Sequence, residues 1–74
     1  MRHNEHFEKV IGGKVFWTFK KSYSYDSVSV FRDMILGHTP GVYMGDVWIE
    51  LILPNTTVAV DMDEPTYLKL WETK

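Results

Sequence analysis

The sequence contains no cysteine, which excludes a disulfide framework and any metal site built on thiolates. A small domain without such cross-links depends on its hydrophobic core for stability. A chain of 74 residues buries only about 60% of the surface that its unfolded form exposes. We therefore expect one domain over residues 1–74, with modest stability and a core built from large side chains.

Long apolar runs are also missing from the sequence. Runs such as Leu51-Ile52-Leu53 are three residues long, whereas a membrane-spanning helix needs about 20 apolar residues. The first six residues are polar and do not form the apolar segment of a signal peptide. These absences predict a soluble, cytoplasmic protein that makes no membrane contact.

A basic excess is absent as well, since the formal net charge is −2. General nucleic-acid binders usually carry a strong excess of lysine and arginine. The charge is nevertheless uneven: residues 1–37 hold six basic and four acidic groups (+2), and residues 38–74 hold two basic and six acidic groups (−4). Any basic surface is therefore expected in the first half of the chain.

The segment from Asp46 to Asp61 predicts a β-hairpin, because two runs rich in β-branched residues flank the turn signal Pro54-Asn55. Any loop of even length places the odd-numbered residues Val47 to Leu53 on one face with Val58 and Val60. A loop of odd length would turn that apolar face to water. Of the two even loops, we favour four residues over two, because proline suits a type I turn and not a primed turn.

Residues 14–21 predict a second strand with two distinct faces. Val15, Trp17 and Phe19 alternate along one face, which we assign to the core. The opposite face interleaves cations, an aromatic ring and a hydroxyl. Its members are Lys14, Phe16, Thr18 and Lys20.

Residues 4–11 allow two interpretations. The spacing of Phe7, Val10 and Ile11 fits one face of a short N-terminal helix that ends at Gly12. The alternative is a strand that turns through Gly12-Gly13 into the strand after it, since Gly-Gly suits a primed turn. That strand would mix polar and apolar residues on both faces, so we favour the helix.

Two further helices are predicted. Residues 28–36 have Val28, Phe31 and Ile35 at helical spacing, although Ser27 to Val30 alternate as in a strand. Residues 64–73 form a C-terminal helix capped by Asp63. We expect its apolar face to pack on the sheet, with the residues Tyr67, Leu68, Leu70 and Trp71 on that face.

The segment between these helices completes the fold. The sequence predicts a loop from His38 to Gly41. Residues 42–44 are expected to form a short strand or a lead-in to the hairpin, with a turn or bulge at Gly45-Asp46. The resulting class is α+β: a small antiparallel sheet of three to four strands (about 14–21, 42–53 and 56–61) with helices at about 28–36 and 64–73 and the short N-terminal helix.

No constellation in the sequence predicts catalysis. His3 and His6 are spaced to share a metal on a helix, and Asp46 and Asp61 stand at the base of the predicted hairpin. Turn and capping chemistry accounts for the acidic groups, and a solvated terminal pair accounts for the histidines. No nucleophile elbow or phosphate-binding loop is present. We expect a non-enzyme with no metal and no cofactor.

The outward face of strand 14–21 is the candidate binding surface. We predict that it continues into the loop after the strand, which adds aromatic rings. The predicted partner-binding residues are Lys14, Phe16, Thr18, Lys20, Lys21, Tyr23 and Tyr25. The expected partner is a larger protein; the alternative is single-stranded nucleic acid, which pairs stacked bases with aromatic rings and phosphates with lysines.

These features favour a small non-catalytic protein-binding module that regulates or inhibits a larger protein. Phage-type inhibitors of host enzymes, such as the transcription machinery, share this build, which is an analogy of class and not of residues.

Overall fold

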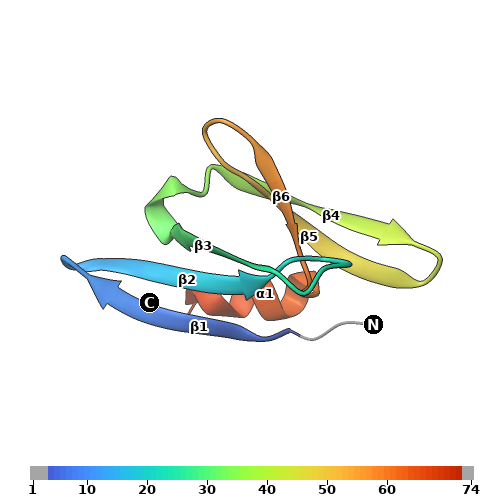
Figure 1. Cartoon of the computed structure of the whole chain (residues 1–74), viewed down its shortest axis with the longest axis horizontal. Helices are drawn as coiled ribbons and strands as arrows, with labels where there is room; N and C mark the ends of the chain where they lie inside the picture. Colours follow the sequence, from blue (N-terminus) through green and yellow to red (C-terminus); the bar gives the residue numbers. More distant parts are fainter. Residues whose placement is uncertain (1–3, 73–74) are drawn as a thin grey trace.

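A computed structural model describes residues 4–72 as six strands, one 3₁₀ turn and one α-helix. The elements are β1 (His6–Ile11), β2 (Lys14–Lys20), β3 (Ser27–Phe31), η1 (Arg32–Met34), β4 (Gly37–Tyr43), β5 (Asp46–Ile52), β6 (Thr57–Val60) and α1 (Glu64–Glu72). The strands form two antiparallel sheets, in the orders β1-β2-β3 and β4-β5-β6 (Figure 1). The α+β class is confirmed in outline, with most of the described chain in sheet. The predicted single sheet of three to four strands is wrong, because six strands form two separate sheets. Among residues 4–72 no helix has the length and apolar character that crossing a membrane requires.

The predicted N-terminal helix over 4–11 is wrong, because the chain forms β1 there. Gly12 and Gly13 have φ values of 59° and 78°, which fits the primed two-residue turn that joins β1 to β2. The register sets Glu8 opposite Trp17 and Lys9 opposite Phe16, as in the strand alternative. The mixed faces are tolerated because β1 is exposed along almost its whole length.

The predicted helix over 28–36 is also wrong. Residues Ser27–Phe31 form β3, and only a single 3₁₀ turn, η1, follows it. Val28 and Val30 lose side-chain freedom in a helix but pack well on a pleated sheet. Val30 lies opposite Trp17 and is buried in the core, so the strand alternation of this segment prevails over its helical spacing.

The segment expected to be a loop before the hairpin is part of β4. The predicted strand over 42–53 is two strands, which a turn with positive φ at Met44 (49°) and Gly45 (86°) joins. Proline cannot donate to a sheet ladder, yet Pro40 lies within β4. The position is tolerated because β4 is an edge strand of its sheet.

The prediction that the odd-numbered residues of β5 share one buried face with Val58 and Val60 of β6 is confirmed. Ile49 pairs with Val60 and Leu51 with Val58, and Ile49, Leu51 and Val60 are fully buried. The preference for a four-residue loop is wrong, because the Leu53 N–H donates to the Thr56 carbonyl at 2.8 Å. This register leaves Pro54 and Asn55 as the turn, and neither has positive φ.

The core lies where the inner faces of both sheets meet α1 (Figure 1). Trp17 and Phe19 of β2 are buried as predicted, and the Trp17 ring packs edge-on against Tyr67 and Trp71 of α1. The helix begins as expected, since the Thr66 N–H donates to Asp63 Oδ1 at 2.9 Å. Its buried face differs in part from the prediction, because Leu68 remains 42% exposed while Tyr67 is buried.

The two sheets are joined at one corner. Beyond the end of β2, Lys21 pairs with Val60, and the Asp61 N–H donates to the Lys20 carbonyl at 2.8 Å. The Ser22 N–H donates to the Ala59 carbonyl at 3.0 Å. Backbone pairing therefore fixes the loop after β2 against the end of β6, and this loop carries three of the predicted site residues.

Candidate functional site

The first sheet presents a face that lies opposite the core. The strand register brings residues of β1, β2 and β3 together on it. We call this surface the outer face; its residues are Phe7, Lys9, Ile11, Lys14, Phe16, Thr18, Ser29 and Phe31. Phe16 lies directly opposite Phe31, and their rings pack edge-to-face with centroids 4.9 Å apart. A rigid sheet therefore holds aromatic rings and lysines side by side.

Ion pairs partly neutralise the lysines of this region. The Lys14 ammonium lies 3.3 Å from an Asp33 carboxylate oxygen, and both groups are exposed. Lys20 lies 3.5 Å from Asp61, whose side chain is only 7% exposed. An exposed pair of the first kind contributes little stability, whereas a buried carboxylate needs its cation. Lys20 therefore has a structural role at the corner where the sheets join.

One hollow lies beside Tyr25, between β1 and the start of β3. It has a volume of about 220 Å³, and Phe7, Thr18, Lys20 and Tyr25 are among its lining residues. Phe7 is 72% exposed, and Tyr25 is fully exposed. The hollow thus combines two accessible aromatic rings with the aliphatic stem of a lysine.

A second hollow of about 350 Å³ lies at the other end of the outer face. Phe16 and Phe31 line it together with Met34, Leu53 and Pro54. Its lining is mainly apolar, because it sits between the outer face and the loop of the β5–β6 hairpin. Phe16 is partly buried here by neighbouring apolar residues.

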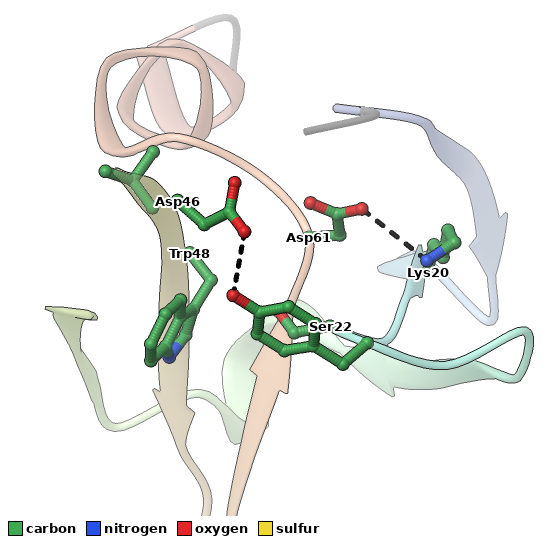
Figure 2. A pocket seen from close by; sticks show the side chains of 7 residues that line it. Lys20, Ser22, Asp46, Trp48 and Asp61 are labelled. Carbon is green, nitrogen blue, oxygen red and sulfur yellow. Dashed lines mark hydrogen bonds and ion pairs between the residues drawn. The ribbon is translucent and has the colours of Figure 1, made fainter. Parts of the chain in front are cut away.

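Tyr23 contacts the second sheet, although it also lines one hollow together with Tyr25. Its hydroxyl donates to Asp46 Oδ2 at 3.0 Å, and its ring packs edge-on against Trp48 of β5 (Figure 2). The hydrogen bond to the Asp46 carboxylate raises the pKa of the Tyr23 phenol, and burial adds to this shift. Tyr23 thus ties the loop after β2 to the second sheet while staying 69% exposed.

The carboxylates of Asp46 and Asp61 both line the small cavity shown in Figure 2, whose volume is about 90 Å³. Asp46 accepts the Tyr23 hydrogen bond, and Asp61 pairs with Lys20. Within residues 4–72 no three histidine, aspartate or glutamate side chains gather as a metal site. Of the predicted histidine pair, His3 lies outside the described residues, and His6 packs near the Phe19 ring.

The predicted site residues are therefore only partly brought together. Thr18, Lys20 and Tyr25 border the hollow beside Tyr25, while Phe16 borders the apolar hollow. Lys14 is exposed beside Asp33, and Tyr23 packs on Trp48 of β5 but shares a further hollow with Lys20 and Tyr25. Lys21 is partly buried, and its backbone bridges to Val60.

Sequence reasoning missed five residues of the outer face, because β1 and β3 were assigned to helices. They are Phe7, Lys9, Ile11, Ser29 and Phe31. The alternation of Ser27-Val28-Ser29-Val30 carried the signal for Phe31. For Phe7 the signal was the pair Gly12-Gly13, which marks a hairpin.

Comparison of the chain with protein-family models, with curated protein sequences and with solved structures found no match.

Proposed function

We propose that this protein is a small non-catalytic protein-binding module that uses its outer face and Tyr25 to regulate or inhibit a larger protein. The observation that carries the proposal is the pair of accessible rings, Phe7 and Tyr25, at one hollow of a rigid sheet. Large aromatic side chains that fill pockets supply most of the energy of protein interfaces. A host enzyme, as for inhibitors of phage type, is the proposed class of partner.

The charge arrangement favours protein over single-stranded nucleic acid as the partner. Nucleic acid binding relies on lysines that neutralise phosphates, and its strength falls steeply with salt. Here Lys14 and Lys20 each lie within ion-pair distance of an aspartate. Lys9 adds one exposed cation to the same face, which suits an acidic patch at the rim of a protein interface.

The test compares capture of a partner by the protein and by three single variants. Phe7→Ala and Tyr25→Ala remove exposed rings at the hollow, and Met44→Ala removes an exposed apolar side chain at the distant β4–β5 turn. A host protein that binds the wild type and Met44→Ala, but binds Phe7→Ala and Tyr25→Ala at least tenfold more weakly as purified components, supports the proposal. Equal binding by all four proteins would refute the proposal that this surface binds the partner.

A second measurement separates the two partner classes. Fluorescence anisotropy with labelled single-stranded DNA and RNA at low salt should show no binding at micromolar protein. Binding that weakens with added salt and is lost in Lys9→Ala would instead establish the nucleic-acid alternative.

A further inference from the structure

Strand β1 has a strand neighbour on one side only, because it stands at the end of the order β1-β2-β3. In Figure 1 it forms the border of the first sheet. Its apolar side chains are open to solvent on both faces: Phe7 is 72%, Val10 65% and Ile11 46% exposed. A strand of this kind is a template for pairing with another chain.

The geometry of the turn between β1 and β2 determines which backbone groups of β1 point away from β2. A two-residue primed turn makes Ile11 and Lys14 a hydrogen-bonded pair, and such pairs alternate along an antiparallel ladder. Lys9 and Phe7 therefore bond to β2, whereas His6, Glu8 and Val10 direct their N–H and C=O groups away from it.

We propose that the free edge of β1 binds a second copy of this chain, antiparallel, about a two-fold axis at Phe7. A two-fold axis perpendicular to the sheet leaves the outer faces of both copies on the same side. Side chains alternate between the two faces, so odd-numbered residues must pair with odd-numbered ones and even-numbered with even-numbered. Phe7 then lies opposite Phe7 of the second copy, and His6 lies opposite its Glu8. Glu5, the residue before β1, lies opposite its Lys9.

Charge favours this register over those with the axis at Glu8 or Lys9. An axis at Glu8 would set two glutamates opposite each other, and an axis at Lys9 would do the same with two lysines; like charges directly opposite are destabilising. With Phe7 on the axis, each Glu5 meets a Lys9, while the Glu8 carboxylate keeps its hydrogen bond from the Trp17 indole N–H at 2.8 Å. Charges on an edge strand normally discourage pairing. Here their order makes the edge complementary to itself.

The pairing would join two three-stranded sheets into one of six strands. The two outer faces become continuous, and the exposed Phe7 rings meet at the centre. Pairing through one strand buries a small area, which places the dimer among weak, concentration-dependent complexes. The edge shares Glu5 and Phe7 with the hollow beside Tyr25, but self-association tests it without the proposed partner.

Sedimentation velocity at protein concentrations from about 10 μM to 1 mM tests the proposal with variants that exchange the charges at positions 5 and 9. The wild type should show a sedimentation coefficient that rises with concentration toward that of a dimer. Glu5→Lys and Lys9→Glu alone should each weaken association about tenfold, because two ion pairs become two repulsive pairs. The double variant Glu5→Lys/Lys9→Glu should return to within about threefold of the wild type.

Matched controls carry the same charge changes on α1. Lys69→Glu and Glu72→Lys lie on exposed helix positions and should leave the dissociation constant within about threefold of the wild type. Circular dichroism of every variant verifies the fold. A wild type that stays monomeric at 1 mM overturns the proposal. So do single variants that associate like the wild type, or a double variant no better than the singles.

Discussion

The contact between Gly41 of β4 and Trp48 of β5 gives a sharp test of the fold. These residues are directly paired, and a methyl group placed on Gly41 would overlap the Trp48 indole. Gly41→Ala therefore forces the ring to move away from the position in which it packs against Tyr23. Gly37, in the same strand, is the matched control, because a methyl group there would lie an ordinary 3.7 Å from the Ile52 Cδ1 atom.

The expected magnitude follows from two opposing terms. Replacing glycine by alanine restricts the unfolded chain and stabilises the fold by about 0.4–1 kcal/mol where the native conformation permits it. This term is common to both variants. Overpacking costs about 1–3 kcal/mol and applies only at Gly41. Gly41→Ala should therefore be less stable than Gly37→Ala by about 1–3 kcal/mol, and each kcal/mol corresponds to roughly 4–8 °C in Tm for a domain of this size.

Thermal and urea denaturation of both variants measure this difference. Trp48→Leu, alone and combined with Gly41→Ala, completes a double-mutant cycle. Since removal of the indole also removes the overlap, Gly41→Ala should cost almost nothing in the Trp48→Leu background. The reasoning is refuted if Gly41→Ala is as stable as Gly37→Ala, or if its cost persists without the indole.

Two further predictions concern the helix cap and alkaline pH. Asp63→Ala should destabilise the protein by about 1 kcal/mol and lower the helical circular dichroism signal, because the Thr66 N–H loses its acceptor; an unchanged urea midpoint would contradict this role. The pKa of Tyr67 is raised mainly by burial, and that of Tyr23 mainly by its hydrogen bond, so folding favours the neutral phenols. This contribution is complete below about pH 10, the ordinary pKa of a phenol, and is lost as the pH rises through the higher folded-state values, so stability should fall as the pH rises above 10. Tyr67→Phe should lose less stability than the wild type as the pH rises above 10, and an equal loss would exclude Tyr67 as a contributor.

Pattern reasoning succeeded where one face of a strand is buried and the other is not. In β5 and β6 a slip of one residue would expose Ile49, Leu51 and Val60 together, so parity alone identified the core side. The loop length was not fixed by this argument, because both even loops preserve parity. The observed register instead joins Leu53 to Thr56 across an unprimed turn.

Helical spacing misled where it coincided with strand alternation. Phe7, Val10 and Ile11 fit one face of a helix, and as a strand they appear on both faces. Burial usually decides between the two patterns, but β1 has no buried face to impose alternation. The Gly12-Gly13 turn was the better guide, since it specifies a hairpin whatever the side chains do.

The ion pair between Lys20 and Asp61 could not be predicted from local signals. Asp61 was read as a helix-capping or turn residue, whereas it is buried at the corner where the end of β2 meets the end of β6. That corner depends on how the two sheets come together, over 41 residues of chain. Lys20 has the parity of the outward face, as predicted, but strand alternation does not report which distant carboxylate a long side chain reaches.

The wrong prediction for β1 and the proposal that β1 binds another chain have the same physical cause. Inference from periodicity assumes that apolar residues point inward, and β1 breaks that assumption with Phe7 and Ile11 on one face and Val10 on the other. Exposing three apolar side chains on an unpaired edge gains the isolated domain nothing and invites association. A strand that breaks local rules without a gain in stability is where a functional constraint is expected. We therefore expect β1, in one of the two segments wrongly predicted to be helical, to bind another chain.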